Sequence, residues 1–257
     1  MTVSKQKHSH YSGIKKSFEK ALHTYDYEAI IQRQASQLLI DSLIQIRFSP
    51  KKVLDLGCGT GHITARLCEV FPISSLHIND FSERLLEKAS LHLQSLNPVR
   101  LPFNFDQEWH YTDLYDLIFS NMALQWSFNI HAVLKKCHNH LNNNAFLAFS
   151  LPLKGSFVEL NTHQRIPFHT YDKVYQALTT SEFDIVHADQ LNLCQEFKTH
   201  LQALKSIKRC GANYVPQNTP PKLIDRLKLY LPSTLTYRIG IFIATKRIKD
   251  ENLYNWH

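Results

Sequence analysis

Residues 51–63 read KKVLDLGCGTGHI, an apolar segment that runs directly into a cluster of glycines. The apolar part, Val53–Leu56, predicts a short buried strand. The glycines, Gly57, Gly59 and Gly61, predict a sharp turn that brings the main chain close to a ligand, because glycine has no Cβ atom. A helix that begins after such a turn points its free N–H groups at the same place. Strand, glycine turn and helix together predict a doubly wound α/β fold that binds a nucleotide-like ligand.

The spacing of the glycines narrows the choice of ligand. A dinucleotide fingerprint is G-x-G-x-x-G, whereas this loop is G-x-G-x-G and follows Asp55, whose carboxylate suits an ammonium group better than a phosphate. The segment DLGCGTG resembles motif I of the class I methyltransferases, which bind the cationic methionine end of S-adenosylmethionine beside this loop. The resemblance implies that Cys58 also contacts the cofactor. A dinucleotide site, and a tight turn without any ligand, are the alternatives.

A second carboxylate follows the next predicted strand, residues 75–79. Asp80 lies 25 residues beyond Asp55. An acidic residue in this position accepts hydrogen bonds from both ribose hydroxyls of a nucleoside. The alternative role is to cap the following helix, although Ser82 already offers a cap.

Three more residues are expected beside the cofactor. Asp106 ends a weaker third strand, residues 99–105, and in the resembled fold an acidic group there faces the adenine amino group. Asn121 follows the fourth strand, residues 116–120, and the loop after that strand lies across the switch point of the sheet from the glycine loop. The resemblance adds Phe81, which directly follows the second strand's carboxylate.

Strands and helices alternate up to residue 152, and the pattern then changes. Alternation predicts a parallel sheet. We therefore expect an α/β, Rossmann-like class I methyltransferase fold: a mostly parallel seven-stranded sheet with helices on both faces and a helical lid or insertion after the fifth strand. Residues 1–13 are polar and are expected to fray. Helices are predicted at residues 14–22, 27–46, 60–71, 82–93, 128–141, 156–165, 171–179, 199–210 and 221–231. Later strands are predicted at residues 145–151 and 235–246, with one or two strands within residues 183–197.

This pattern divides the chain into four regions. We expect a helical cap at residues 1–46 and the cofactor-binding core at residues 47–152. A substrate or lid insertion that includes one strand follows at residues 153–232. The chain then ends with an edge strand and tail at residues 233–257.

The composition limits the class of protein. With 257 residues, 44% of them hydrophobic, the chain can bury one substantial core. No run approaches the roughly eighteen apolar residues of a membrane span, and residues 1–30 contain no apolar signal core and no arginine. The five cysteines form no C-x-x-C pair, and the histidines lack metal-ligand spacing. A cytoplasmic protein without metal or membrane contact is expected.

Positive charge is concentrated near the end of the chain. The formal net charge is +7, yet residues 198–250 contain eleven Lys or Arg against two Asp, a net charge of +9. Such a segment favours an acidic partner, either nucleic acid or an acidic carrier protein, which long-range steering would attract. A solvated basic face without a partner is the alternative.

Several segments together point to a narrower family. They are Phe18…Ala21…Tyr25-Asp26…Gln32-Arg33, VLDLGCGTG at 53–61, FSNMALQW at 119–126, GSFVEL at 155–160, and Leu204-Lys205…Lys208…Gly211-Ala212-Asn213. They resemble the malonyl-acyl-carrier-protein O-methyltransferases of the biotin pathway. One departure is Asn142–Asn144, where the family usually has a proline-glycine-glycine turn. Asparagine tolerates left-handed conformations, so we interpret this as substitution within a turn.

The resemblance implies a reaction. S-adenosylmethionine donates a methyl group to the free carboxylate of a malonyl thioester on acyl carrier protein, and S-adenosylhomocysteine is the product. An ionised carboxylate needs no general base, so the enzyme has only to align the reactants in a desolvated pocket. We expect Tyr25, Gln125 and Trp126 to wall that pocket, because aromatic faces attract a sulfonium. Packing in the core is the alternative for each of them.

Substrate contacts and competing functions complete the hypothesis. Arg33, Lys205 and Lys208 are candidates to hold the malonyl carboxylate, and the two lysines with Arg209 are candidates to dock the carrier. The alternatives are a methyltransferase for a free small acid or quinone precursor, an RNA methyltransferase, and a non-methylating assembly factor on the same fold. The Asn-Pro-Pro-Tyr motif of base methylation is absent, so no nucleic-acid partner is expected. The oligomeric state stays open.

Overall fold

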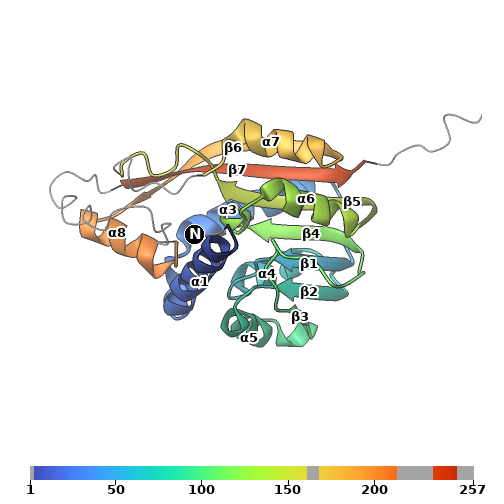
Figure 1. The fold of residues 1–257 in the computed structure, drawn as a ribbon, viewed down its shortest axis with the longest axis horizontal. Helices are drawn as coiled ribbons and strands as arrows, with labels where there is room; N and C mark the ends of the chain where they lie inside the picture. Colours follow the sequence, from blue (N-terminus) through green and yellow to red (C-terminus); the bar gives the residue numbers. More distant parts are fainter. Residues whose placement is uncertain (1–2, 161–167, 213–233, 248–257) are drawn as a thin grey trace, which may run out of the picture.

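A computed structural model describes residues 3–160, 168–212 and 234–247, and within them seven strands form one sheet in the order β3-β2-β1-β4-β5-β7-β6 (Figure 1). The paired strands from β1 to β5 are parallel, whereas β7 is antiparallel to both of its neighbours. The predicted mostly parallel, seven-stranded sheet is confirmed. The strands are β1 (Lys52–Leu56), β2 (Ser75–Asn79), β3 (Val99–Leu101), β4 (Tyr115–Asn121), β5 (Leu141–Pro152), β6 (Phe183–Glu196) and β7 (Thr234–Lys246).

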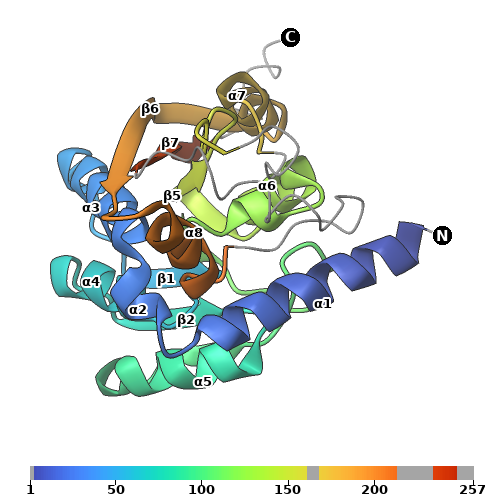
Figure 2. The same cartoon turned by 90° about the vertical axis from the view of Figure 1, so that its left-hand side faces the viewer.

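Helices cover both faces of the sheet, as predicted (Figures 1 and 2). Buried side chains of α3, α4 and α5 pack on one face, and those of α6 and α7 pack on the other. The described helices are α1 (Val3–Ala21), α2 (Tyr25–Glu28), α3 (Ile30–Gln45), α4 (His62–Val70), α5 (Glu83–His92), α6 (Ile130–Asn139), α7 (Tyr171–Thr180) and α8 (His200–Arg209), with short 3-10 turns at Gln94–Leu96 and Leu124–Trp126. No helix in these ranges is long and apolar enough to cross a membrane.

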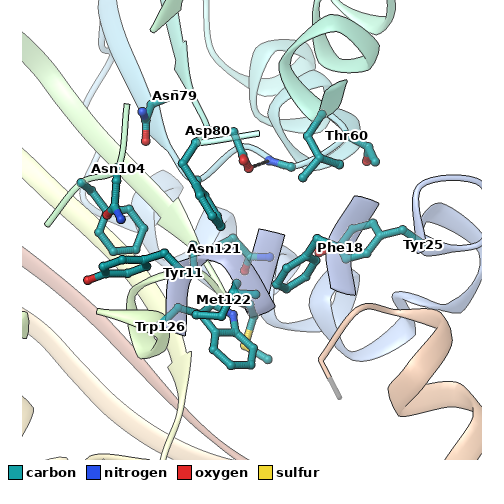
Figure 3. A pocket seen from close by; sticks show the side chains of 17 residues that line it. Tyr11, Phe18, Tyr25, Thr60, Asn79, Asp80, Asn104, Asn121, Met122 and Trp126 are labelled. Atoms are coloured by element: carbon teal, nitrogen blue, oxygen red, sulfur yellow. Dashed lines mark hydrogen bonds between the residues drawn. The ribbon is translucent and has the colours of Figure 1, made fainter. Parts of the chain in front are cut away.

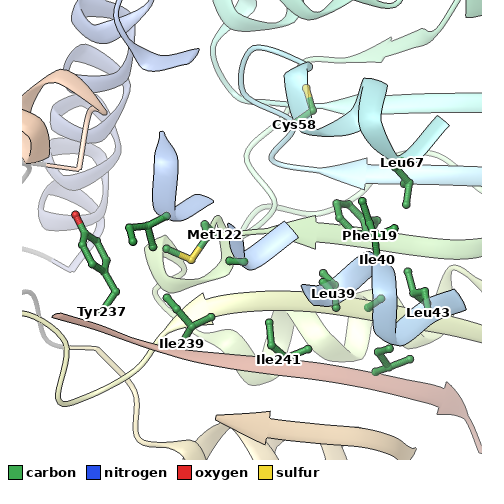
Figure 4. Close-up of a cluster of buried hydrophobic side chains, with 14 of the residues drawn as sticks. Leu39, Ile40, Leu43, Cys58, Leu67, Phe119, Met122, Tyr237, Ile239 and Ile241 are labelled. Atoms are coloured by element: carbon green, nitrogen blue, oxygen red, sulfur yellow. The ribbon is translucent and has the colours of Figure 1, made fainter. Parts of the chain in front are cut away.

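The core consists of two hydrophobic clusters, one on each face of the sheet. Alternate residues of a strand point to opposite faces, so in β4 the side chains of Leu117 and Phe119 join one cluster and Ile118 joins the other. Figure 4 shows the first cluster, in which Leu39 of α3 lies against the strands. A sheet buried on both faces explains why its central strands are almost continuously apolar.

The C-terminal strand occupies a different place from the one predicted. β7 lies between β5 and β6, so the prediction of an edge strand within residues 233–257 is wrong, and β6 forms that edge. The burial of the two strands gives the reason. Residues 239–244 of β7 are buried, whereas the outer strand β6 is mostly exposed or half-buried along its length. A strand that is covered on both faces belongs inside the sheet.

The N-terminal region also differs from the prediction. Helix α1 already begins at Val3, so residues 3–13 are helical rather than frayed. The predicted helix over residues 27–46 is broken at Ala29, whose φ of −76° and ψ of 48° are not helical, and this separates α2 from α3. Both differences matter for function, because α1 and α2 cover one side of the cavity described below.

Some predicted elements fall partly or wholly outside the described residues. The helix predicted over residues 156–165 is instead a series of turns up to residue 160, and its remainder lies outside the described ranges, as do the helix predicted at 221–231 and the proline-rich turn at 216–221. The asparagine segment was predicted as a turn before the fifth strand, but it lies within β5, which already begins at Leu141. Asn144 has a φ of 60°, in the left-handed region that asparagine tolerates.

Candidate active site

The glycine loop between β1 and α4 contains two kinds of glycine. All three have positive φ, of 82° at Gly57, 58° at Gly59 and 77° at Gly61. A Cβ atom at Gly57 would lie 2.5 Å from the Ala123 Cβ, and one at Gly61 would lie 2.9 Å from the Ala89 Cβ. At Gly59 a Cβ would meet no atom within 4 Å. The outer glycines therefore allow close packing, whereas the middle one borders open space.

Asp80 joins the glycine loop to the start of α5. Its Oδ2 accepts a hydrogen bond from the Gly59 N–H at 3.2 Å, drawn in Figure 3, and its Oδ1 accepts one from the Ser82 N–H at 2.8 Å. The Ser82 hydroxyl in turn accepts from the Leu85 N–H at 3.5 Å and caps the helix, as predicted. Asp80 thus anchors the loop and also reaches the cavity.

A cavity lies where β1, β2 and β4 end, beside the switch point between β1 and β4, and Figure 3 shows its walls. Open α/β sheets bind ligands at this point. One side is formed by the ends of the strands and the loops that follow, and the other by α1 and α2. The lining residues are Tyr11, Ile14, Phe18, Tyr25, Gly57, Gly59, Thr60, Asn79, Asp80, Phe81, Leu85, Asn104, Phe105, Asn121, Met122, Ala123 and Trp126.

The cavity is narrow because α1 closes over it. About 60 Å³ is free, the space of a few water molecules. Aromatic rings occupy much of the opening: Phe18 lies edge-on to Trp126 with ring centroids 5.9 Å apart, and Phe18 also contacts Tyr25 at 6.2 Å. A ligand of nucleoside size requires the side chains of α1 to move outward.

Seven of the residues predicted from the sequence line this cavity. They are Tyr25, Gly57, Gly59, Asp80, Phe81, Asn121 and Trp126. The side chain of Asn121 is held by its own contacts, because its Nδ2 donates to the Gln32 carbonyl at 3.0 Å and its Oδ1 accepts from the Ser150 hydroxyl at 2.7 Å.

Asp55 and its loop neighbours lie behind the cavity wall. The buried Asp55 carboxylate accepts a hydrogen bond from the Thr64 hydroxyl at 2.5 Å, so it holds the start of α4 against the end of β1. Cys58 is buried in a hydrophobic cluster. Gly61 packs against α5. None of these three lines the cavity, which departs from the expectation of direct ligand contact.

Asp106 is also away from the cavity lining. Its carboxylate accepts hydrogen bonds from the Tyr11 hydroxyl, from the Ser127 hydroxyl at 2.8 Å and from the Phe128 N–H at 3.1 Å. Asn104 and Phe105, just before it in the chain, line the cavity instead. The short third strand ends at Leu101, so the following irregular segment sets which side chain reaches the cavity.

Gln125 and Arg33 do not reach the cavity either. The Gln125 Nε2 donates to the Met122 carbonyl at 2.6 Å, within the turn that also carries Trp126. The Arg33 guanidinium donates to the main-chain carbonyl of Asp26 and so ties α3 to α2. Both side chains stabilise the walls of the site. Lys205, Lys208 and Arg209 lie on α8, outside this cavity.

Sequence reasoning missed several lining residues, of which Tyr11 and Asn79 are the most informative. Tyr11 lies in the segment expected to fray. Asn79 is the last residue of β2 and is fully buried; its Nδ2 donates to the Leu101 and Phe103 carbonyls, both at 2.8 Å. Its position at the carboxyl end of a parallel strand, beside Asp80, could have predicted that Asn79 lines the cavity.

Two polar atoms in the cavity wall have no partner. Among the described residues, the buried Asn79 Oδ1 accepts no hydrogen bond and the buried Trp126 Nε1–H donates none. Buried polar groups are almost always hydrogen-bonded, so an acceptor and a donor are both free where a ligand would lie.

A network around Asp26 fastens the N-terminal helices to the glycine loop. Its carboxylate accepts from the Thr60 hydroxyl and, at 2.6 Å, from the Lys88 ammonium on α5. Partial burial would raise the pKa of Asp26, but the hydrogen bonds from Lys88 and Thr60 and the positive charge of Lys88 outweigh it and lower that pKa. The ionised carboxylate therefore holds α2, and with it Tyr25, in place beside the cavity.

The buried carboxyls of Asp55 and Asp80 have unusual acidity. Burial raises the pKa of each to about 7, opposed for Asp55 by the Thr64 hydrogen bond and for Asp80 by the main-chain N–H groups of Ser82 and Gly59. The negative charge of Asp80 raises the pKa of Asp55 further. Between the ordinary pKa of about 4 and pH 7, the folded protein therefore holds protons that the unfolded chain has released.

This predicts a pH dependence of stability. Because the native state binds more protons between about pH 4 and pH 7, the unfolding free energy contributed by Asp55 falls as the pH rises through that window and is constant above it. Its size is at most about 4 kcal/mol. Asp55→Asn mimics the protonated acid at every pH. The unfolding free energy of wild type should therefore fall relative to that of the variant between pH 5 and pH 7.5. Urea denaturation at the two pH values measures it, and an unchanged difference would contradict the raised pKa.

The fold and the site together define a class I methyltransferase, the class that uses S-adenosylmethionine. A model of the methyltransferase domain matches residues 54–147. Among solved structures, the YcgJ protein of Bacillus subtilis aligns with a TM-score of 0.63 at 14% identity, covering 83% of this chain and all of that one. The N-methyltransferase NodS of Bradyrhizobium japonicum, in complex with S-adenosylhomocysteine, aligns with a TM-score of 0.58 at 13% identity, covering 91% and 98%.

Curated relatives define the family within that class. Malonyl-[acyl-carrier protein] O-methyltransferase 2 of Coxiella burnetii is 36% identical over 239 residues, which cover 92% of this chain and 96% of the relative. The malonyl-[acyl-carrier protein] O-methyltransferase of Methylococcus capsulatus is 29% identical, covering 82% and 80%. The chain belongs to the malonyl-[acyl-carrier protein] O-methyltransferase family.

Proposed function

We propose that this protein transfers a methyl group from S-adenosylmethionine to the free carboxylate of malonyl-acyl carrier protein, forming a malonyl methyl ester early in biotin synthesis. The observation that carries the proposal is the combination of a near full-length match to relatives named for this activity with a cavity at the sheet's switch point, walled by a glycine loop and Asp80.

The residues that line the cavity fit this cofactor. Open space at Gly59 leaves room beside the main chain. Asp80 supplies carboxylate oxygens for the ribose hydroxyls, and the unpartnered Asn79 Oδ1 supplies a further acceptor. The faces of Tyr25 and Trp126 attract positive charge. Phe81 and Asn121 complete the wall. Asp55 and Asp106 act indirectly in this proposal, by holding the loops that bear the lining residues.

When bound, S-adenosylmethionine supplies an electrophilic methyl group on a sulfonium centre. The chain's own residues have to orient the malonyl carboxylate and exclude water. The carboxylate is ionised at neutral pH, so no base is required. Burial raises the pKa of the Tyr25 hydroxyl, which therefore stays protonated and is suited to donate a hydrogen bond rather than to accept a proton. Closure of α1 over the cavity removes water and strengthens the electrostatic attraction of the reactants.

The partner in this proposal is acyl carrier protein bearing a malonyl thioester. The family names support it, and α8 presents Lys205, Lys208 and Arg209 on an exposed surface. We propose a cytoplasmic location, supported by the five cysteines, which are all free thiols as is typical of a reducing compartment. No nucleic acid has a role in this proposal.

Transfer of label tests the proposal. Purified protein is incubated with methyl-labelled S-adenosylmethionine and either malonyl-acyl carrier protein, free malonate or total RNA. We expect base-labile label on the malonyl carrier. Label on free malonate alone would identify a small-acid methyltransferase, label on RNA would identify a nucleic-acid enzyme, and absence of label from all three would favour an assembly factor on the same fold.

A further inference from the structure

A second cavity lies between α1 and α8, which are neighbours in Figure 2. Its volume is about 440 Å³, and we call it the α1–α8 groove. Five of the residues that line it are cationic. The lining residues are Gly13, Lys16, Ser17, Lys20, Ala21, Thr24, Lys205, Lys208 and Arg209.

Most of this positive charge is not neutralised. The Arg209 guanidinium pairs with the Glu28 carboxylate at 2.8 Å. For the four lysines, no carboxylate of the described residues comes within 4.0 Å. All four lysines are exposed. The groove is therefore a concentrated positive site that is open to solvent.

The arrangement of the lysines opposes helix stability. Lys16 and Lys20 are four residues apart on α1, and Lys205 and Arg209 are four apart on α8. Like charges at this spacing repel and destabilise a helix. A favourable interaction with the helix dipole accounts for the cations in the last turns, Lys20 and Lys208. It does not account for Lys16 and Lys205, which lie earlier in their helices.

The groove adjoins the cofactor cavity through α1. Lys16 and Ser17 line the groove, whereas the next residue, Phe18, lines the cavity. The end of α8 packs on Phe18 as well, because a Cβ atom at Gly211 would lie 2.6 Å from the Phe18 Cδ1. The Thr24 hydroxyl also donates to the Arg209 carbonyl at 2.8 Å. One helix diameter, about 10 Å, separates an anion in the groove from the cavity.

We propose that the α1–α8 groove binds the phosphate ester of the flexible arm that carries the malonyl thioester. This inference rests on the proposed function and adds to it a site for a defined chemical group. Four lysines and an arginine around one depression suit a phosphate, and the volume is that of a small-ligand site rather than a flat protein interface. An arm anchored there by its phosphate has only to pass α1 for its acyl end to reach the methyl donor.

The test compares two arms that differ only in the phosphate. Malonyl-pantetheine and malonyl-4′-phosphopantetheine are assayed as methyl acceptors, and pantetheine and 4′-phosphopantetheine are titrated calorimetrically. We expect wild type to prefer the phosphorylated arm by about 10-fold or more in kcat/KM, since several exposed ion contacts each contribute up to about a factor of five. Binding of 4′-phosphopantetheine should weaken with added salt.

A pair of matched variants assigns the preference to the groove. In Lys16→Gln/Lys20→Gln/Lys205→Gln/Lys208→Gln the preference should fall close to one. The control Lys51→Gln/Arg100→Gln/Lys135→Gln/Lys173→Gln removes the same charge from exposed positions elsewhere and should keep the wild-type ratio. Thermal unfolding checks that both variants fold.

The outcomes separate this inference from the function on which it rests. Equal rates for the two arms in wild type would overturn the phosphate site and leave methyl transfer intact. An unchanged preference in the groove variant would overturn the phosphate site as well. The same holds if the groove variant loses activity only toward the whole carrier protein, because that result would indicate docking of a protein surface. If malonyl-acyl carrier protein itself is not methylated, the proposed function fails, and calorimetry with 4′-phosphopantetheine alone decides whether the groove binds phosphate.

Discussion

Replacing Asp80 by asparagine will weaken the binding of S-adenosylhomocysteine by about 100-fold. The substitution keeps the size of the side chain but removes the charge that Asp80 carries above its pKa of about 7, so the measurement is made at about pH 8. Hydrogen bonds to a charged group contribute about 1.5–3 kcal/mol, and loss of about 2.8 kcal/mol corresponds to a factor of about 100. In addition, one oxygen becomes an NH₂ group, which cannot accept a hydrogen bond. Since the Gly59 and Ser82 N–H groups each donate to a different oxygen of Asp80, one of them loses its acceptor. Calorimetric titration with S-adenosylhomocysteine measures the effect.

Asp116 offers a matched control for this variant. Its carboxylate also accepts hydrogen bonds from two main-chain N–H groups, those of Lys51 at 3.0 Å and Lys52 at 2.9 Å, but it lies at the opposite end of β1 and β4 from the cavity. Asp116→Asn should lower the unfolding free energy while leaving the affinity for S-adenosylhomocysteine within about twofold of wild type. Equal losses of affinity in the two variants would show that Asp80 acts only through folding.

Replacing Gly57 by alanine will destabilise the protein by about 3 kcal/mol or more. Its φ of 82° costs an L-residue about 1–2 kcal/mol. The added methyl group would also lie 2.5 Å from the Ala123 Cβ, and overpacking of this kind typically costs about 1–3 kcal/mol. The clash forces the loop away from the turn after β4, which separates two walls of the cavity. Urea denaturation measures the loss of unfolding free energy, and a loss smaller than about 1 kcal/mol would contradict this close packing of Gly57 against Ala123.

The same substitution at Gly59 distinguishes packing from ligand contact. Its φ of 58° brings a similar backbone cost, but the new Cβ would meet no atom within 4 Å. Gly59→Ala should therefore destabilise the protein by only about 1–2 kcal/mol. Because the methyl group points into open space beside the cavity, it should lower the affinity for S-adenosylhomocysteine. Unchanged affinity would show that the ligand does not approach this residue.

Much of the site could be predicted because its parts are adjacent in the chain. A buried strand, a glycine turn and a helix N-terminus follow one another between residues 51 and 63, and their spacing alone distinguishes this loop from a dinucleotide fingerprint. Asp80 follows the next strand, so the parallel pairing of β1 with β2 necessarily brings it beside the glycine loop. The aromatic walls, Tyr25 and Trp126, came from the family resemblance and also line the cavity.

Other side chains could not be placed from the chain order. Asp55 and Asp80 both stand where parallel strands end, yet the structure turns Asp55 toward the Thr64 hydroxyl and Asp80 toward the cavity. Tyr11 lies in a polar segment without a periodic apolar face, and it reaches the site because α1 extends across the open side of the sheet. Asp106 was expected at the cavity, but its carboxylate binds that same Tyr11.

Local patterns of apolar, glycine and acidic residues were enough to establish the α/β class, the cofactor loop and the carboxylate that follows β2, because each depends on residues within a few positions of one another. The order of β6 and β7, the inward turn of Asp55 and the α1–α8 groove depend on contacts between distant segments, such as the hydrogen bond between Thr24 and Arg209, which are 185 residues apart. Packing free energy, summed over the folded chain, selects those contacts, and no short stretch of residues contains it.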